Sequence, residues 1–342
     1  MSSRVFLPRS SRCGTERVGI QSMYEFLLSA DLMVPDPDGH AALLVKRLGV
    51  LERADYRQAF PTHGYIAHFL RVHKSLAVAP TRLEPQHHVD VEKPVDPIFA
   101  DYLDSIDEFQ GRYRPVKTHS LVVACSDMEG LLEKLHRRRL PFRVAPLDER
   151  LAWERVWVGT TPEQPRYTPV VDGGLCLEFH PVYPLRMPEA TFATPPPEPR
   201  DPDPADMVRI VSRSFLVRDL DDVLRRLSAN LDFEPAGPVE LFEQEGIRRA
   251  RITFGVAHSA IVELIEPTRW DCPAGKYLHT WGPGPYNIRI AVVDLAAKAA
   301  DLSERDTRYV EVPELASAGG PVVQVDPADL NGTLIEFVPF RR

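Results

Sequence analysis

Internal repetition is the feature of this sequence that most constrains its fold. A strand-like run that leads into an acidic helix start occurs at SRSFLVRDLDDVLRRL from Ser212, at NIRIAVVDLAAKAADL from Asn287 and at HSLVVACSDMEGLLEKL from His119. The stretch SADLMVPDPDGHAALLVKRLG, from Ser29, has the same pattern, and Gly49 is the expected end of its helix. Each run precedes further strands, the last of them apolar. The matched spans have similar lengths and predict four copies of one β-α-β-β-β unit: 29–76, 119–178, 212–263 and 287–336.

Acidic and hydroxyl side chains mark the starts of the helices. Asp219 and Asp294 are placed to accept hydrogen bonds from the free amides of the first helical turn. Ser126 and Glu129 have the spacing of a capping box, which predicts that Ser126 caps the second helix. Counting back from each cap gives one first-strand position per unit: Ser29, His119, Ser212 and Asn287.

A glutamate interrupts the apolar closing strand of three units. Glu178 lies in GLCLEFHP, Glu263 in AIVELIEP and Glu336 in TLIEFVP, whereas the first unit has Leu76 at the matched position. A buried carboxylate must be hydrogen-bonded, paired or bound to a metal ion. One interpretation is therefore a ligand or pocket role for these acids. The alternative is that they are exposed or pair with an arginine across the sheet.

A proline-rich segment divides the chain into two pairs of units. Residues 184–207, PLRMPEATFATPPPEPRDPDPADM, contain too much proline for a helix or a central strand and predict an extended linker. The expected organisation is a flexible leader (1–20), an N-terminal domain of two units (21–183), the linker (184–207) and a C-terminal domain of two units (208–342). Separately, an apolar stripe predicts a helix that packs on the first sheet: Phe99, Tyr102, Leu103, Ile106 and Phe109.

Composition excludes several classes of function. Lys plus Arg is 41 and Asp plus Glu is 49, and a net charge of -8 argues against nucleic acid as the main partner. No apolar stretch approaches the roughly 20 residues that span a bilayer. The basic N-terminus lacks the apolar run of about 7–15 residues of a secretory signal. The four cysteines are widely spaced, as expected for a reducing compartment. We therefore expect a cytoplasmic protein without a membrane or nucleic-acid partner.

Four tandem β-α-β-β-β units, with NGTLIEFVP near the C-terminus, resemble the vicinal oxygen chelate superfamily, which includes glyoxalase I, extradiol dioxygenases and bleomycin-binding proteins. The resemblance implies an α+β fold in which paired units form two cup-shaped mixed β-sheets. It also implies a divalent metal in the cup, held by histidines of the first strands and glutamates of the closing strands. The metal would be iron, zinc, manganese or nickel.

The resemblance assigns ligands according to which units pair. If neighbouring units pair, the first cup holds Asp31, His119 and Glu178 as metal ligands. His180, on the strand face of Glu178, would be a fourth group or a proton shuttle, and Glu178 and His180 are the expected catalytic residues. The second cup lacks histidine, and its residues are candidates for pocket lining or for an alternative metal site: Ser212, Glu263, Asn287 and Glu336.

If instead the second unit pairs with the third, one cup holds His119, Glu178, Ser212 and Glu263. Neighbour pairing is favoured because sequential elements usually pack together. The implied function is a metal-dependent enzyme, a dioxygenase or an isomerase or lyase, acting on a small substrate with two neighbouring oxygens. The alternative is a metal-free protein that binds or sequesters a small molecule in the same cups. Oligomeric state is left open, with a homodimer as one option.

Overall fold

The computed structural model describes residues 23–52, 57–60, 65–88, 97–145 and 155–341. The leader expected at residues 1–20 lies outside this part of the chain. The N-terminal half contains two units with an additional helix, α2, between them. Its elements are β1 (Tyr24–Met33), α1 (Pro37–Leu48), β2 (Arg57–Phe60), β3 (Tyr65–His68), β4 (Arg82–His88), α2 (Pro97–Gln110), β5 (Leu121–Cys125), α3 (Met128–Arg137), β6 (Phe142–Ala145), β7 (Arg155–Val158) and β8 (Leu177–Pro181).

The C-terminal half repeats the pattern, with α5 between its two units. Its elements are β9 (Met207–Leu216), α4 (Leu220–Leu231), β10 (Glu240–Phe242), β11 (Ile247–Ile252), β12 (Ile261–Pro267), α5 (Pro273–Trp281), β13 (Gly284–Val292), α6 (Leu295–Glu304), β14 (Tyr309–Leu315), β15 (Gly320–Val325) and β16 (Leu334–Pro339). Short 3-10 helices complete it: η2 (Tyr183–Leu185), η3 (Glu189–Phe192), η4 (Ala316–Ala318) and η5 (Pro327–Leu330).

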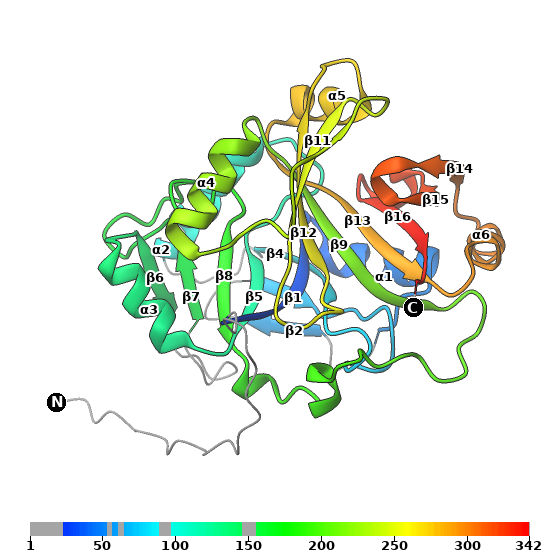
Figure 1. Cartoon of the computed structure of the whole chain (residues 1–342), viewed down its shortest axis with the longest axis horizontal. Helices are drawn as coiled ribbons and strands as arrows, with labels where there is room; N and C mark the ends of the chain where they lie inside the picture. The colour runs from blue at the N-terminus through cyan, green and yellow to red at the C-terminus, as the bar shows by residue number, and fades with distance from the viewer. Residues whose placement is uncertain (1–22, 53–56, 61–64, 89–96, 146–154, 342) are drawn as a thin grey trace.

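Each half forms one eight-stranded mixed sheet (Figure 1). The strand orders are β2-β3-β4-β1-β5-β8-β7-β6 and β10-β11-β12-β9-β13-β16-β15-β14. The first strands of two units pair antiparallel at the centre of each sheet, and every closing strand runs parallel to its own first strand. Neighbouring units therefore share a sheet, and the predicted α+β fold with paired units is confirmed. The alternative pairing of the second unit with the third does not occur.

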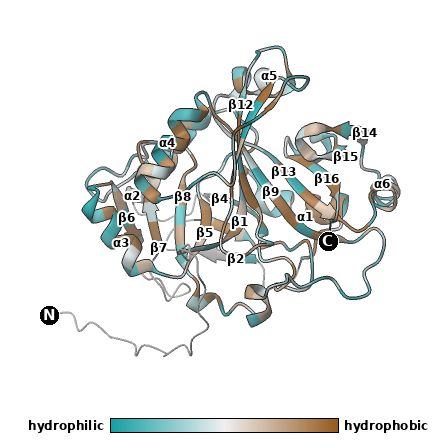
Figure 2. Ribbon diagram, viewed as in Figure 1, coloured by the Kyte–Doolittle hydropathy of each residue, from teal (hydrophilic) through white to brown (hydrophobic). Residues whose placement is uncertain are grey.

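Amphipathic helices cover one face of each sheet. Along α4, apolar residues recur every three or four positions, and Figure 2 shows apolar and polar residues on this helix. The residues that it buries are Leu220, Val223, Leu227 and Leu231. They belong to a core cluster that takes residues from both sheets. Helix α3 contacts α4, so the helical layers of the two halves also meet.

The helix caps correct one prediction. Helix α3, the helix of the second unit, is capped by Asp127 and not by Ser126. Asp127 Oδ1 accepts a hydrogen bond from Gly130 N at 2.8 Å. Asp219 and Asp294 cap α4 and α6 as predicted, and Asp36 caps α1 in the same way. Because the cap is one residue later, the position equivalent to Asn287 is Ser120. His119 precedes β5 instead of lying within it.

The closing strand of the first unit is also corrected. Leu76 lies in a turn, and β4 begins six residues later at Arg82. The partner of Asp31 on β4 is Glu84, as the partner of Ser214 on β12 is Glu263. Every unit thus has a glutamate on its closing strand. The apolar run before Pro80 has the pattern of a strand. The sequence of β4 does not, because it contains a proline and several polar residues.

The two halves are joined by backbone hydrogen bonds as well as by the common core. Gly255 N donates to Tyr24 O at 2.9 Å, and Val256 N donates to Glu25 O at 2.7 Å. The proline-rich stretch 184–206, which is fully described, contains 3-10 turns and no strand. The boundaries of two separate domains remain a prediction, because the core is continuous between the halves.

Helix α2 confirms the predicted stripe. Tyr102, Leu103 and Ile106 pack against Trp157 of β7 and Met33 of β1. Trp157 is the antiparallel partner of Glu178, so both side chains lie on the same face of the N-terminal sheet. Helix α2 therefore covers the face that bears Glu178.

Among the residues described, no helix is both long enough and apolar enough to cross a membrane.

Burial of His40 predicts acid sensitivity. His40 on α1 is 1% exposed, and its Nε2 lies 3.1 Å from Thr333 Oγ1 in the other half. Burial lowers the pKa of His40 to about 4. A pKa below its unfolded value means that stability is intact above about pH 6.5 and is lost as the pH falls toward 4. The unfolding free energy of both chains should fall when the pH is lowered from about 7 to about 4.5. We expect this fall to be about 2 kcal/mol smaller in His40→Gln than in the wild-type chain.

Urea denaturation at the two pH values measures this difference. Equal losses in the wild-type and variant chains would show that His40 does not contribute to the acid sensitivity.

Candidate functional site

Strand alternation directs the candidate side chains to one face of the C-terminal sheet. On β13, Ile288 and Ile290 enter the core, and Arg289 between them points to the opposite face. Arg289 is the parallel partner of Glu336 on β16. Residues opposite each other in neighbouring strands share a face. This register alone brings a cation beside an acid.

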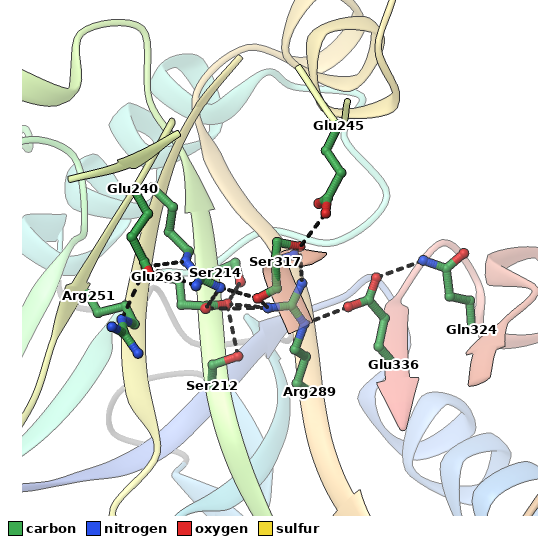
Figure 3. A network of polar contacts seen from close by, with 11 residues as sticks. Ser212, Ser214, Glu240, Glu245, Arg251, Glu263, Arg289, Ser317, Gln324 and Glu336 are labelled. Atoms are coloured by element: carbon green, nitrogen blue, oxygen red, sulfur yellow. Dashed lines mark hydrogen bonds and ion pairs between the residues drawn. The ribbon is translucent and has the colours of Figure 1, made fainter. Parts of the chain in front are cut away.

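Glu263 is the centre of the polar cluster on this face (Figure 3). It is 2% exposed, and its carboxylate accepts hydrogen bonds from four side-chain donor atoms. The donors are Ser212 Oγ at 3.1 Å, Ser214 Oγ at 2.9 Å, Arg249 Nη1 at 2.8 Å and Arg289 Nη1 at 3.0 Å. A carboxylate with this many donors is fully compensated for its burial.

Arg289 joins the two glutamates of the cluster. Its Nε donates to Glu336 Oε2 at 2.7 Å, while Nη1 donates to Glu263 Oε2 at 3.0 Å. Its Nη2 donates to Ser317 Oγ at 3.2 Å. Burial disfavours the charge of Arg289, but Glu263 and Glu336 outweigh that effect and raise its pKa above the ordinary value. The guanidinium is therefore a permanent, fixed cation.

A turn beside η4 supplies a further acceptor. Gly319 has φ 74°, a left-handed conformation that suits glycine, and it ends η4 before β15 begins. The carbonyl of Ser317 accepts hydrogen bonds from both Arg249 and Arg289. Ser317 N is itself held by Glu245 Oε1 at 2.8 Å. Loop geometry thus fixes the orientation of both guanidinium groups.

Outer ion pairs complete the cluster. Arg249 Nη2 lies 2.9 Å from Glu240 Oε2, and Arg251 Nε lies 3.3 Å from the same oxygen. On the other side, Gln324 Nε2 donates to Glu336 Oε1 at 2.9 Å. Figure 3 shows that these contacts extend the network to the strands on both sides of the cluster.

Two adjoining cavities open over this face of the sheet. One, of about 330 Å³, is lined by the cluster, including Arg249, Glu263 and Arg289. The second, of about 500 Å³, lies beside it and is more apolar. Five residues line both cavities: Val211, Ile261, Ala318, Val338 and Arg341. Together they form a pocket of the size that small-molecule sites usually have.

In the N-terminal sheet, Asp31 has a structural environment. Its Oδ2 accepts hydrogen bonds from Thr118 Oγ1 at 2.8 Å, from His119 N at 2.7 Å and from Ser120 N at 3.2 Å. Its Oδ1 accepts from Gln86 Nε2. These four donors occupy most of the lone pairs of the carboxylate. Asp31 therefore anchors the chain that enters β5.

The other residues predicted for the first cup make two close contacts, and the charge of Glu178 also acts on His119. His119 Nδ1 lies 3.3 Å from Asp31 Oδ2, and His180 Nε2 lies 2.9 Å from Glu178 Oε1. Burial alone would raise the pKa of Glu178, but His180 and Arg155 outweigh burial and lower it. Burial alone would lower the pKa of His119, but Asp31 raises it above the ordinary value.

The donor chemistry of these pairs suits a divalent metal, but their arrangement does not. Within the described ranges, no group of three or more histidine, cysteine, aspartate or glutamate residues could hold a metal ion. Asp31 is already bonded to protein donors, and a site of this type needs at least three protein ligands. The residues present therefore do not fit the metal that the resemblance implies.

Part of the predicted second cup is brought together. Ser212, Glu263 and Glu336 all belong to the cluster, and pairing with an arginine across the sheet is confirmed for both glutamates. Asn287 is buried two residues before Arg289, and its Oδ1 has no hydrogen-bond partner within the described structure. Within the described residues, Asn287 Oδ1 makes no hydrogen bond to the cluster.

Sequence reasoning missed the arginines and one serine. Arg289 and Ser214 each lie two residues after a predicted position, so strand period placed them on the same face. Arg249 offered a weaker signal, because β11 contains three arginines in RRAR. Glu84 was missed because the closing strand of its unit was placed too early.

Comparisons with known proteins agree with this fold. No family model matches the chain. The uncharacterized protein YqjC of Bacillus subtilis (strain 168) is 26% identical over 91 residues, which are 26% of this chain and 65% of that protein. The match thus spans somewhat less than two thirds of the curated relative.

Among solved structures, a mutant of 4-hydroxymandelate synthase from Streptomyces coelicolor superposes with a TM-score of 0.60 and 16% identity, covering 92% of each chain. A methylmalonyl-CoA epimerase from the same organism is 29% identical and covers 40% of this chain and all of its own, with a TM-score of 0.36. The full-length superposition has the same architecture of paired units. The chain therefore has the fold of the vicinal oxygen chelate superfamily, as the repeated units predicted.

Removing Arg289 tests the cluster. Arg289→Met leaves Glu263 and Glu336 buried without their shared cation, and we expect unfolding free energy to fall by about 3 kcal/mol. The double variant Arg289→Met/Glu263→Gln removes one of the uncompensated charges, so it should recover part of this loss. Urea denaturation at neutral pH measures both. A loss well below about 1 kcal/mol in the single variant would show that the pairing is not a structural requirement.

Proposed function

We propose that this protein binds a small oxygenated molecule in the pocket of its C-terminal sheet without a metal ion. One observation carries the proposal. Arg289 lies between Glu263 and Glu336, the two acids that the resemblance offers as metal ligands, and forms an ion pair with each. The guanidinium of Arg289 thus occupies the position between the two acids that a metal ion would take.

Electrostatics opposes a divalent ion in the same place. A metal would have to take oxygens that already accept hydrogen bonds from Arg249, Arg289, Ser212 and Ser214. It would also lie next to two guanidinium groups, whose charge repels it. Removing the guanidinium groups from their carboxylates would leave buried charges without partners, which is costly.

The arrangement suits binding better than proton transfer. Guanidinium N–H groups recognise carbonyl and carboxylate oxygens, so those N–H groups of the cluster that are not bonded to its own acceptors can orient a ligand. The carboxylates of the cluster, in contrast, are held as ion pairs and hydrogen-bond acceptors. The adjoining cavities of about 330 and 500 Å³ supply the space. This is the metal-free binding function that the sequence left as the alternative.

A metal-dependent enzyme with its ion in the N-terminal sheet is the second candidate. What favours it is that Asp31, His119, Glu178 and His180 are all buried in that half, and that the charges of Asp31 and Glu178 both act on His119, which places the two acids near one histidine. The solved proteins that resemble the chain are named as a synthase and an epimerase. Dioxygenase, isomerase or lyase chemistry with iron, zinc, manganese or nickel belongs to this candidate. A cytoplasmic location and a homodimer also stay predictions.

Elemental analysis separates the two candidates. We expect purified protein to contain far less than one equivalent of iron, zinc, manganese or nickel, because the C-terminal cation site is filled by Arg289. About one equivalent per chain, lost in both His119→Ala and Glu178→Ala, would overturn the metal-free proposal and support the second candidate. The variant Arg225→Gln, on the exposed face of α4, serves as the control.

Ligand binding tests the location of the pocket. Ala318 lines both cavities, so the indole of Ala318→Trp should fill the space that they share. Ligand-detected NMR with a library of small oxygenated fragments should find binders of the wild-type chain that Ala318→Trp no longer binds. Ala300→Trp, on the exposed side of α6, is the matched control and should bind as wild type does. Retained binding in Ala318→Trp, or no binder of the wild-type chain, would contradict the proposal.

A further inference from the structure

The larger cavity has walls suited to an apolar body. It measures about 500 Å³ and is lined by Val211, Ile261, Val338 and Phe340. Residues 195 and 196, both prolines of the segment between the two sheets, close another side. The predicted linker therefore also forms part of a pocket wall. A cavity of this size accommodates a small molecule and shields its apolar part from water.

A buried arginine in this cavity, Arg209, has Glu198 as an acidic neighbour, whereas the cluster arginines are hydrogen-bonded to buried carboxylates. Arg209 is 9% exposed, and its Nε has no hydrogen-bond partner among the described residues. The guanidinium carbon lies 4.9 Å from the centre of the Phe340 ring. A buried cation that stacks on an aromatic ring still requires acceptors for its N–H groups. The cavity is the place from which a ligand oxygen could reach it.

A histidine in the same cavity offers the opposite hydrogen-bonding group. His258 is 5% exposed, and its Nε2 lies 2.7 Å from Ala77 O, so this nitrogen carries the proton and donates. Burial lowers the pKa of His258, which keeps the ring neutral near pH 7. Its Nδ1 is then an acceptor, and it has no partner within the described structure.

The charges that line the cavity favour a monoanion. Arg209 and Arg341 contribute two positive charges and Glu198 contributes one negative charge, which leaves a net charge of one positive. His258 adds none while it is neutral. A ligand with a single carboxylate would balance this charge, whereas a dianion would exceed it.

We infer that the ligand of the C-terminal pocket is a small hydroxy carboxylate with an apolar tail. The carboxylate accepts hydrogen bonds from Arg209, the hydroxyl donates to Nδ1 of His258, and the tail lies against the apolar wall. This inference rests on the proposed function, because it assigns the ligand class of the same pocket. It adds the two recognition groups that the polar cluster does not provide.

Isothermal titration calorimetry with three related probes tests the inference. The probes are 2-hydroxyhexanoate, hexanoate, which lacks the hydroxyl, and hexanamide, which lacks the charge. For the wild-type chain we expect 2-hydroxyhexanoate to bind about tenfold more tightly than hexanoate, and hexanoate about tenfold more tightly than hexanamide. The first step removes the hydroxyl group, and the second removes the charge of the carboxylate.

Two variants assign the groups to their residues. Arg209→Met should abolish the preference for hexanoate over hexanamide, and His258→Phe should abolish only the preference for the hydroxylated acid. Arg225→Gln, an exposed arginine on α4, removes the same net charge as Arg209→Met and should behave as wild type. Thermal unfolding of each variant shows whether it is folded before binding is compared.

Several results would overturn the inference. These are equal binding of hexanamide and hexanoate, unchanged preferences in either variant, or no binding of any probe to the wild-type chain. The proposed function fails separately, when no neutral or charged fragment binds the wild-type pocket or when Ala318→Trp does not reduce binding. Neutral fragments that bind in an Ala318-dependent manner, with no preference for carboxylates, would leave the proposed function standing and reject the hydroxy carboxylate.

Discussion

The ion pairs of Arg289 with Glu263 and Glu336 are the interaction on which the C-terminal site depends. Two carboxylates on neighbouring strands of one sheet face would repel each other and lose hydration on burial. One guanidinium, held at 2.7 Å from Glu336 and 3.0 Å from Glu263, satisfies both. It also fixes the relative positions of β12, β13 and β16, whose side chains line the cavity. The pocket is preorganised because its polar floor is already complete.

The two halves use the same architecture differently. In the N-terminal half, α2 covers the face that bears Glu178, and Tyr102 stacks on Trp157 with ring centres 5.3 Å apart. In the C-terminal half, the corresponding face opens into the two cavities. The halves remain coupled through the common core and through Arg213, whose Nη2 donates to Asp31 O at 3.2 Å. We interpret the N-terminal sheet mainly as structural support for the binding site in the C-terminal sheet.

Sequence reasoning succeeded where the signal was local. The repeated units, the caps Asp219 and Asp294 and the stripe of α2 follow from periodicity and from hydrogen bonding within one helical turn. It failed where a single residue changed the register. Taking Ser126 in place of Asp127 as the cap moved the first-strand position from Ser120 to His119. A shift of one residue in a strand reverses the side-chain face, so the predicted metal ligand was not at the equivalent position.

The fold followed from the sequence alone: four units of strand, helix and strands, three of them with a glutamate recognised on the closing strand. The roles of those charges depend on how the strands pair. Arg289 lies 26 residues from Glu263 and 47 from Glu336 in the chain, and no local pattern indicates that they meet. Their contact depends on which strands pair and in which register, and that is set by burial of the whole sheet against its helices. The same residue types could have held a metal ion, but the pairing of strands gave them a guanidinium instead.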